Sequence, residues 1–371
     1  MRLRELVEGT ELTVRGSDDI EVTTIANDSK KAVVGSLFIA IKGIAEDGHD
    51  FLPQAVARGA TALVVEDEAR VPMGFAGPVM VVPNARGALN WLSGRFFGDP
   101  GKRLFCVGVT GTDGKTSVTH MVEAVLAAGG MPTAVIGTVD HHFGEHRWPG
   151  DTTPAPLVMQ ERLAQFRDLG ARAVALEATS QGLSQSRVSG VPFDVAVFTN
   201  LTRDHLDYHR SLDAYFEAKQ RLFTEALAGS PKANRFAIIN IDTPYGARIS
   251  VPSNTTKWTY GRLGSGADLE VEVIAMSLSQ SVFRLRAWEK EAELRLPLLG
   301  AFNGENALAA IAVGVAAGGD FHACVEALRH FEGVPGRVQR VVHPGAKTVF
   351  IDYAHSPDAF EKVLGTARAA M

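Results

Sequence analysis

A glycine-rich tract, TGTDGKTS over residues 110–117, has the clearest chemical content in the sequence. Glycines let backbone N–H groups curl around an anion, a lysine such as Lys115 can pair with terminal phosphates, and a hydroxyl such as that of Thr116 can ligate Mg²⁺. The strict G-x4-G-K-[ST] spacing is missed, because Val109 stands five residues before Gly114. The tract predicts a nucleotide-binding loop, and the alternative is an ordinary glycine turn with an exposed lysine.

Acidic and imidazole side chains follow two other apolar runs. Glu177 lies at the end of AVALEA, and the cluster Asp204, His205, Asp207 and His209 follows DVAVFTN. Open α/β sheets bind ligands at the carboxyl ends of their strands, and carboxylates there can hold a divalent cation. From the residues alone, Glu177 can also be a strand-end carboxylate in water or in a salt bridge, and the second cluster can be a solvated turn.

Lys219 is the fourth candidate position. It lies in SLDAYFEAKQRLF, a helical pattern for which Ser211 is the expected N-cap. Composition alone predicts a surface lysine, because lysines are rarely buried.

The elements that must position these groups follow the alternation of an α/β protein. Apolar runs of strand length alternate with helical patterns, at residues 104–109, 133–139, 172–178, 194–200 and 235–240. This alternation predicts a mostly parallel sheet with helices on both faces. The helix after the glycine tract should end at Gly129 and Gly130. Period-2 alternation between Lys257 and Leu298 predicts antiparallel strands.

The length of 371 residues predicts two or three domains. Residues 20–100 alternate short β-rich runs with helical segments, and FGDPGKR, with Pro100 and Gly101, interrupts that pattern. GVPGRVQRV marks a second interruption. We therefore expect domains at residues 1–100 and 101–338, and the 33 residues left at 339–371 (371 − 338) are too few for a third complete domain.

Composition excludes several classes of protein. With 37 basic and 42 acidic residues the net charge is −5, which gives no basic field for nucleic acid or anionic membrane. Two cysteines, Cys106 and Cys324, cannot build a disulfide framework or a four-cysteine zinc site. The N-terminus has no apolar signal-peptide core, and the stretch from Ala307 to Gly318 is too short to span a bilayer. These features predict a cytoplasmic protein with no nucleic-acid partner and no membrane insertion.

The loop variant Gly-Thr-x-Gly-Lys-Thr resembles the ATP loop of the Mur ligase superfamily. Further segments resemble its MurE group, in the same order along the chain: DSK and LFIAIKGIAEDGHDFLPQAVARGATALVVE, DTTP, EATSQGLSQSR, FDVAVFTNLTRDHLDYHRSLDAYFEAKQRLF, LPLLGAFNGENALAA, GVPGR and IDYAHSPDA. MurE ligases use ATP to join an amino acid, usually meso-diaminopimelate or L-lysine, to UDP-N-acetylmuramoyl-L-alanyl-D-glutamate through an acyl phosphate. The resemblance implies a uridine-nucleotide α/β domain, a central ATP-binding domain with a P-loop-type parallel sheet and a small antiparallel patch, and the start of a Rossmann-like third domain.

The resemblance also implies roles for individual residues. The ATP-loop contacts would be Gly111, Thr112, Asp113, Gly114, Lys115, Thr116 and Ser117; the adenine-side contacts Asn303 and Asn306; and the groups closing over ATP Arg337, Asp352 and His355. Two Mg²⁺ ions would be held by Thr116, Glu177, His205 and a carbamylated Lys219, which together with Lys115 would form the catalytic set. The muropeptide contacts would be Ser29, Thr152, Thr153, Ser180, Gln185 and Arg187. Read alone, the two asparagines can equally be helix N-caps.

The sequence departs from the MurE pattern in four places. Gln181 stands where MurE proteins commonly have His, Ala178 and Thr179 replace a Val-Ser type pair, and Asp113 replaces the common Asn and adds a negative charge near phosphate. The chain also stops one helix into the third domain, so we expect a truncated chain or a remainder supplied from elsewhere. Two alternatives stay open: a MurF-like or folylpolyglutamate-type ligase, and a catalytically silent nucleotide-binding member. We expect the protein to be a monomer.

Overall fold

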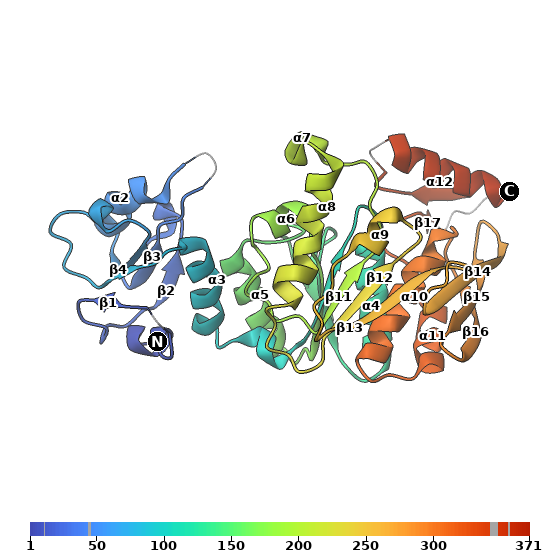
Figure 1. Cartoon of the computed structure of the whole chain (residues 1–371), viewed down its shortest axis with the longest axis horizontal. Coiled ribbons are helices and arrows are strands. Elements are labelled where there is room, and N and C mark those ends of the chain that lie inside the picture. The colour runs from blue at the N-terminus through green and yellow to red at the C-terminus, as the bar shows by residue number, and fades with distance from the viewer. Residues whose placement is uncertain (11, 44–45, 342–347, 355–356) are drawn as a thin grey trace. The chain divides into compact units, whose positions relative to one another are not determined.

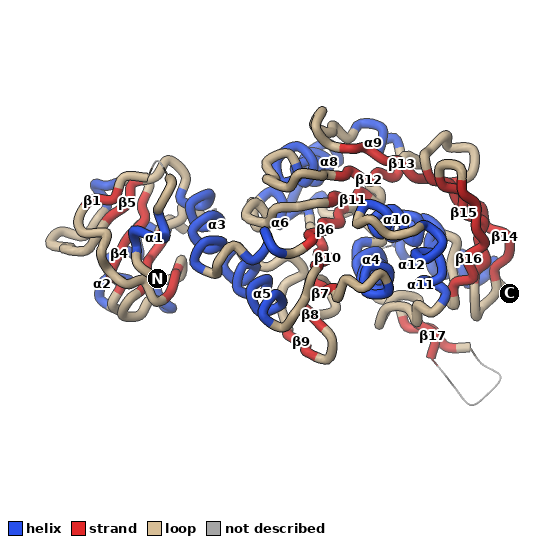
Figure 2. The backbone as a smooth tube through the Cα atoms, turned by 90° about the horizontal axis from the view of Figure 1, so that it is seen from below, coloured by secondary structure: helices blue, strands red, loops and turns tan. Residues whose placement is uncertain are grey.

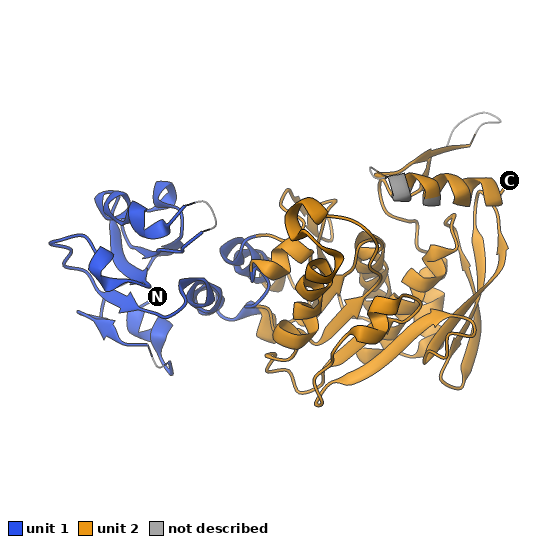
Figure 3. Ribbon diagram, turned by 45° about the horizontal axis from the view of Figure 1, so that its top comes forward, with its two compact units in different colours: residues 1–100, 155–164, 186–190 blue, residues 101–154, 165–185, 191–371 orange. Residues whose placement is uncertain are grey.

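The computed structural model of the chain describes residues 1–10, 12–43, 46–341, 348–354 and 357–371. The chain forms two compact units, drawn in different colours in Figure 3. Unit 1 comprises residues 1–100, 155–164 and 186–190, and unit 2 comprises residues 101–154, 165–185 and 191–371.

Unit 1 is built on a five-stranded sheet in the order β1-β5-β4-β3-β2. Its strands are β1 (Val14–Arg15), β2 (Thr24–Ala26), β3 (Ser36–Ile39), β4 (Ala60–Val65) and β5 (Val79–Val81), and its helices include α1 (Leu3–Val7), α2 (Leu52–Ala57) and α3 (Ala85–Phe96). Strands β2 to β5 are parallel, and β1 is antiparallel to β5. Successive residues of β3 serve opposite faces: Leu37 and Ile39 belong to one apolar cluster and Phe38 to another. The sheet is therefore buried on both faces.

Unit 2 contains an 11-stranded sheet (Figure 1) in the order β16-β15-β14-β13-β12-β11-β6-β10-β7-β8-β9, whose strands are labelled in Figure 2. The strands are β6 (Phe105–Thr110), β7 (Thr133–Ile136), β8 (His141–Phe143), β9 (His146–Trp148), β10 (Ala173–Glu177), β11 (Val195–Phe198), β12 (Phe236–Asn240), β13 (Thr256–Arg262), β14 (Leu269–Met276), β15 (Ser281–Ala287) and β16 (Lys290–Leu296). Pairing is parallel from β7 through β14 and antiparallel at both ends of the sheet. The mixed but mostly parallel α/β fold expected from the sequence is confirmed.

Strand β13 differs from the expectation of antiparallel strands throughout 257–298. It pairs in parallel with both β12 and β14, and only β14 to β16 form the antiparallel patch. The connection after β13 brings Leu269 back beside Tyr260, so β14 runs in the same direction as the strand it follows. Periodicity reports which residues are buried but not the direction of the neighbouring strand.

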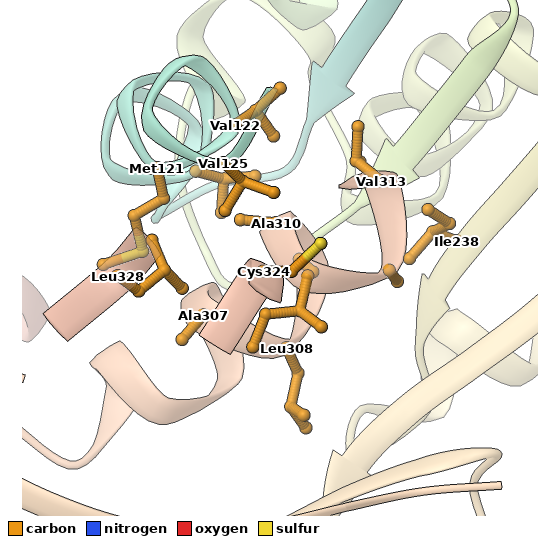
Figure 4. Packing of buried hydrophobic residues seen from close by; sticks show 14 of the residues in the cluster. Met121, Val122, Val125, Ile238, Ala307, Leu308, Ala310, Val313, Cys324 and Leu328 are labelled. Carbon is orange, nitrogen blue, oxygen red and sulfur yellow. The ribbon is translucent and has the colours of Figure 1, made fainter. Parts of the chain in front are cut away.

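Three helices pack inside the curve of this sheet: α4 (Lys115–Ala128), α10 (Phe302–Ala316) and α11 (Phe321–Arg329), as Figure 2 shows. Their contacts include Val125 of α4, Val313 of α10 and Cys324 of α11, which lie in one apolar cluster (Figure 4). Helix α10 is apolar on nearly all sides because it lies between α4 and the sheet. The C-cap of α4 is Gly129, as the sequence predicts.

The described residues also form α5 (Pro156–Asp168), α6 (Ser180–Ser184), α7 (Leu206–His209), α8 (Leu212–Arg221), the π-helical continuation of α8 at Leu222–Leu227, and α9 (Pro244–Arg248). Ser211 caps α8 by accepting from the Ala214 N–H at 3.1 Å, which confirms the expected N-cap. The chain ends with the antiparallel pair β17 (Gln339–Val341) and β18 (Val349–Ile351) and with helix α12 (Pro357–Ala369). None of the helices formed by the described residues combines the length and apolar character that crossing a bilayer requires.

Candidate functional site

The glycine tract forms the connection between strand β6 and helix α4, as its sequence predicts. Gly111 and Gly114 have φ of +152° and +85°, and Gly114 is the N-cap of α4. A Cβ at Gly111 would collide with the Thr199 hydroxyl, so only glycine fits at that point. The turn brings backbone N–H groups to the start of a 14-residue helix, where the helix dipole favours an anion.

The segment after strand β11 holds this loop in place. The Thr199 hydroxyl donates to the Asp113 carbonyl at 2.6 Å, and the Asn200 side chain accepts from the Asp113 N–H at 2.9 Å. The Asn200 carbonyl accepts from the Thr112 N–H at 3.0 Å. These bonds fix the loop before any ligand is present, which lowers the entropic cost of binding one.

Lys115 and Lys219 meet at one atom of the loop. Their ammonium groups lie 3.0 Å and 2.7 Å from the Gly111 carbonyl oxygen. Lys219 is 1% exposed, so the surface position predicted by composition alone is wrong. Burial lowers the pKa of both lysines, and the charge of Lys115 lowers the pKa of Lys219 further. Within the described part of the chain, Lys219 forms no ion pair with a carboxylate.

Tyr215 completes the surroundings of Lys219 from the preceding turn of helix α8. The Lys219 ammonium lies 4.2 Å from the centre of the Tyr215 ring, and the Tyr215 hydroxyl lies 3.3 Å from the Thr112 hydroxyl. Burial raises the pKa of Tyr215, so the phenol stays neutral. This contact was not predicted, although the i, i+4 spacing of Tyr215 and Lys219 on a helix is a signal for it.

Glu177 lies at the carboxyl end of β10 and is fully buried. Its carboxylate accepts from the Thr138 N–H at 2.8 Å and from the Thr138 hydroxyl at 3.1 Å. No basic side chain of the described residues forms a salt bridge with it, so the salt-bridged alternative is not observed there. The charge of Glu177 opposes the lowering of the Lys115 pKa by burial. Thr138, which sequence reasoning missed, follows β7 at the same edge of the sheet.

The two threonines expected to contact substrate lie beside Glu177. The Thr153 hydroxyl donates to the Glu177 carbonyl at 2.7 Å and lies 2.9 Å from the Thr179 hydroxyl. The Thr152 and Thr138 hydroxyls are 3.2 Å apart. The structure thus gathers hydroxyl groups around the end of strand β10.

Helices α6 and α7 carry the next group of predicted residues. His209 Nε2 lies 2.9 Å from the Ser180 hydroxyl, and the Gln185 amide donates to the Tyr208 hydroxyl at 3.1 Å. His205 precedes α7 in the left-handed conformation (φ +50°), its side chain is 46% exposed, and it lies 3.5 Å from the Asp204 carboxylate. The cluster is thus a short helix with one exposed and one buried histidine. Among the described residues, no three His, Cys, Asp or Glu side chains form a ready-made metal site.

Helix α10 and the segment after it supply the other predicted ATP contacts. Asn303 lies inside α10, whose N-cap is Ala301, so the N-cap interpretation is wrong; its amide donates to the Leu299 carbonyl at 3.1 Å. Asn306 faces the glycine loop, since a Cβ on Gly114 would lie 2.7 Å from its side-chain oxygen.

Arg337 donates to the Thr116 hydroxyl at 3.1 Å. Its side chain therefore lies at the glycine loop, although the two residues are far apart in the sequence. Asp352 accepts from the Val338 N–H at 2.7 Å and from the Ala354 N–H at 2.8 Å. His355 lies outside the described residues. The structure therefore places Asn306 and Arg337 at the glycine loop. Asp352 is hydrogen-bonded to Val338, the residue after Arg337.

Two predicted substrate contacts belong to unit 1. Ser29 is buried, and its hydroxyl donates to the Gln54 side-chain oxygen at 2.7 Å. Asp28 caps the short helical turn that contains Ser29, by accepting from the Lys30 N–H. Arg187 lies in the 186–190 segment of the same unit.

Comparison with known proteins identifies both units. Residues 109–314 match the Mur ligase middle domain, and residues 21–95 match the catalytic domain of the Mur ligase family. The chain is 42% identical over 353 residues to the UDP-N-acetylmuramoyl-L-alanyl-D-glutamate–2,6-diaminopimelate ligase of Geobacter metallireducens, covering 95% of this chain and 68% of the relative. It is 42% identical over 369 residues to the ligase of the same name from Geobacter sulfurreducens, covering 99% and 72%.

A solved structure agrees with these relatives. The structure of a UDP-N-acetylmuramoyl-L-alanyl-D-glutamate–2,6-diaminopimelate ligase superimposes with a TM-score of 0.84 at 30% identity, over 99% of this chain and 74% of that one. The similarity therefore extends over both units and the segment after residue 338.

Proposed function

Because the chain belongs to the Mur ligase family, we propose that it is an ATP-dependent ligase that joins 2,6-diaminopimelate to UDP-N-acetylmuramoyl-L-alanyl-D-glutamate, with L-lysine as the alternative amino acid. The observation that carries this proposal is the glycine loop with Lys115 and Lys219 on one carbonyl, in a chain 42% identical over 353 residues to a diaminopimelate ligase. The loop supplies backbone N–H groups that can bind an anion. Beside them lie two lysine side chains whose protonation depends on their surroundings.

The proposed reaction has two steps. The terminal carboxylate of the nucleotide-linked dipeptide attacks the γ-phosphorus of ATP, the bond to ADP breaks, and an acyl phosphate forms. The amine of the amino acid then attacks the acyl carbon, and phosphate leaves with the electron pair of the broken C–O bond. Neither step needs a protein nucleophile. The protein contributes positioning and charge stabilisation, and Lys115 is the side chain best placed to pair with the phosphates.

We propose that Mg²⁺, a cation that prefers oxygen ligands, binds beside the glycine loop, with four residues as its candidate ligands. Thr116 offers a hydroxyl, Glu177 a fully buried carboxylate, and His205 an imidazole; a carbamate on Lys219 would add two oxygens. Bound there, Mg²⁺ would neutralise charge that develops on the phosphates during transfer. Thr116 now accepts from Arg337, so metal binding to its hydroxyl would require that bond to rearrange.

The surroundings of Lys219 in this chain favour its carbamylation. A buried ammonium that shares one carbonyl with another ammonium, and that has no carboxylate partner among the described residues, is costly. Converting it to a carbamate reverses its charge and gives Lys115 an anionic neighbour. We therefore propose that Lys219 is carbamylated in the active protein.

The substrate side of the proposal rests on hydroxyl, amide and guanidinium donors suited to carboxylates and phosphates. In unit 2 these are Thr152, Thr153, Ser180 and Gln185, and in unit 1 they are Ser29 and Arg187. We propose that the remaining contacts to ATP come from Asn303, Asn306, Arg337, Asp352 and His355, and that the protein acts as a monomer.

The test is phosphate release from ATP by the purified chain with UDP-N-acetylmuramoyl-L-alanyl-D-glutamate, with and without meso-diaminopimelate or L-lysine. We expect release to require both the nucleotide sugar and one amino acid, and Lys115→Ala to abolish it while remaining folded by circular dichroism. Release with a folate and glutamate instead would support a folylpolyglutamate-type ligase. Binding of both nucleotides without release by the folded chain would support a silent member.

A further inference from the structure

We propose that His209 is a positioning residue for the nucleotide–dipeptide substrate: it holds the Ser180 hydroxyl so that its proton points to an anionic group of that substrate. The inference rests on the proposed function, and specifies how one side of that site is organised. It assigns a role to a histidine that neither the loop motif nor the expected metal ligands use.

The contact between the two residues is buried on both sides. His209 is 9% exposed and Ser180 is 2% exposed, and His209 Nε2 lies 2.9 Å from Ser180 Oγ. Buried polar side-chain atoms are nearly always hydrogen-bonded, and this contact satisfies the Ser180 hydroxyl. Ser180 is the first residue of α6, so its hydroxyl lies at the start of that helix.

The backbone of helix α7 determines where the His209 imidazole lies. It is a single turn, and the residues on either side of it, His205 and Arg210, are both left-handed (φ +50° and +66°). Non-glycine residues adopt this conformation at a cost, which the surrounding contacts must offset. The buried contact of His209 with Ser180 is one such contact, and that of Tyr208 with Gln185 is another.

The packing of His209 fixes the ring plane. Its ring centre lies 5.2 Å from that of Tyr215 and 4.7 Å from that of Tyr208. Tyr215 in turn carries the Lys219 ammonium over its ring. One aromatic side chain thus supports the imidazole on the substrate side and the lysine on the phosphate side.

The tautomer of the imidazole decides which way the Ser180 hydroxyl can point, because His209 Nε2 is the ring atom that contacts Ser180 Oγ. With the proton on Nε2, the neutral ring donates to Ser180 Oγ, and the Ser180 hydroxyl proton remains free for a carboxylate or phosphate oxygen. The arrangement turns Ser180 into a donor of fixed direction.

The test compares binding of UDP-N-acetylmuramoyl-L-alanyl-D-glutamate and of ATP by calorimetry in four variants: Ser180→Ala, His209→Phe, His209→Gln and the double variant Ser180→Ala with His209→Phe. Phenylalanine keeps the packing against Tyr215 and removes the donor, whereas glutamine keeps a donor at a similar reach. We expect His209→Phe and Ser180→Ala each to weaken nucleotide–dipeptide binding about tenfold, the value of one hydrogen bond to a charged group.

The double variant should bind no more weakly than either single one, because both remove the same interaction. His209→Gln should restore binding to within about threefold of the parent, and ATP binding should change by less than about threefold in all variants. If His209→Phe fails to fold, His209→Asn, which is too short to reach Ser180, replaces it.

Multiplicative losses in the double variant, or equal losses of ATP binding, would overturn the positioning role. If the parent protein ligates and binds its substrates, and His209→Phe binds the nucleotide–dipeptide as tightly as the parent, this inference alone is overturned. Parent protein that does not bind the nucleotide–dipeptide at all would overturn the proposed function as well.

Discussion

The Gly111 carbonyl accepts from both Lys115 and Lys219, so two buried ammonium groups lie close together. Burial lowers the pKa of both lysines, and the charge of Lys115 lowers the pKa of Lys219 further. An uncharged amine is the form that reacts with CO₂, because an ammonium has no free electron pair. The same geometry that makes Lys219 unfavourable as a cation therefore makes it reactive as an amine.

This charge state has a consequence for stability in CO₂-free buffer. The pKa of Lys219 is lower in the folded chain than in the unfolded chain, so between the two values the unfolded chain binds more protons and stability rises with pH. Lys219→Met should flatten that rise, because it removes one of the two lysines whose pKa is lowered in the folded chain. Urea unfolding at several pH values between about 7 and 9, with Lys30→Met as an exposed control, measures the slopes. Equal slopes in the parent and Lys219→Met would contradict the prediction.

Cys106 offers a second prediction at this scale. It is fully buried, and burial raises the pKa of its thiol to about 12. At pH 8 the thiolate fraction falls about a thousandfold relative to a thiol of ordinary pKa, because each pKa unit is a factor of ten. A disulfide reagent should therefore label Cys106 only after unfolding, and peptide mass mapping of native and denatured samples reads this out. Rapid labelling of native Cys106 would show that the strand opens readily.

The strand ends and the glycine loop of the site were predictable from the sequence. The burial of Lys219 and the direction of strand β13 were not. Apolar runs ending in Glu177 or in the glycine tract predict strand ends at one sheet edge, and the structure has them there. The burial of Lys219 was not predictable from composition, because it depends on α8 packing under the loop. The parallel direction of β13 was missed for a similar reason, since alternation is the same in both kinds of pairing.

At the scale of elements, helix α10 packs closely against α4 at Gly314, which has no side chain. A Cβ on Gly314 would collide with Val125 of α4 and lie 2.6 Å from the Cys324 sulfur of α11. Both partners are parts of a close-packed cluster and cannot retreat into empty space (Figure 4). The close approach of three helices therefore depends on one missing side chain.

Gly314→Ala should destabilise unit 2 by about 1–3 kcal/mol, the usual cost of overpacking a core, despite the better helix propensity of alanine. Gly365→Ala is the matched control, because a Cβ there meets nothing within 4 Å in helix α12. Urea unfolding followed by fluorescence measures both. Val125→Ala should recover part of the loss when combined with Gly314→Ala, and a purely additive double variant would argue against the contact.

At the scale of the whole molecule, the predicted site residues fall in two units with separate sheets. The glycine loop, Glu177, Lys219, Asn306 and Arg337 belong to unit 2, and Ser29 belongs to unit 1. Residues 155–164 and 186–190 also group with unit 1, which no local sequence pattern indicates because such grouping is set by tertiary contacts. Each unit has its own apolar clusters, so each can respond separately to a ligand.

Hydrogen exchange can measure this separation directly. ATP with Mg²⁺ should slow amide exchange in residues 110–120 and 199–205, because binding stabilises the state in which the loop is bonded to Asn200. At a hundred times Kd the added protection should reach about 2.7 kcal/mol for amides that exchange only by opening of the site. Unit 1 should not respond to ATP alone. Lys115→Ala should abolish the effect, and protection spreading equally over residues 21–95 would mean that the two units open as one.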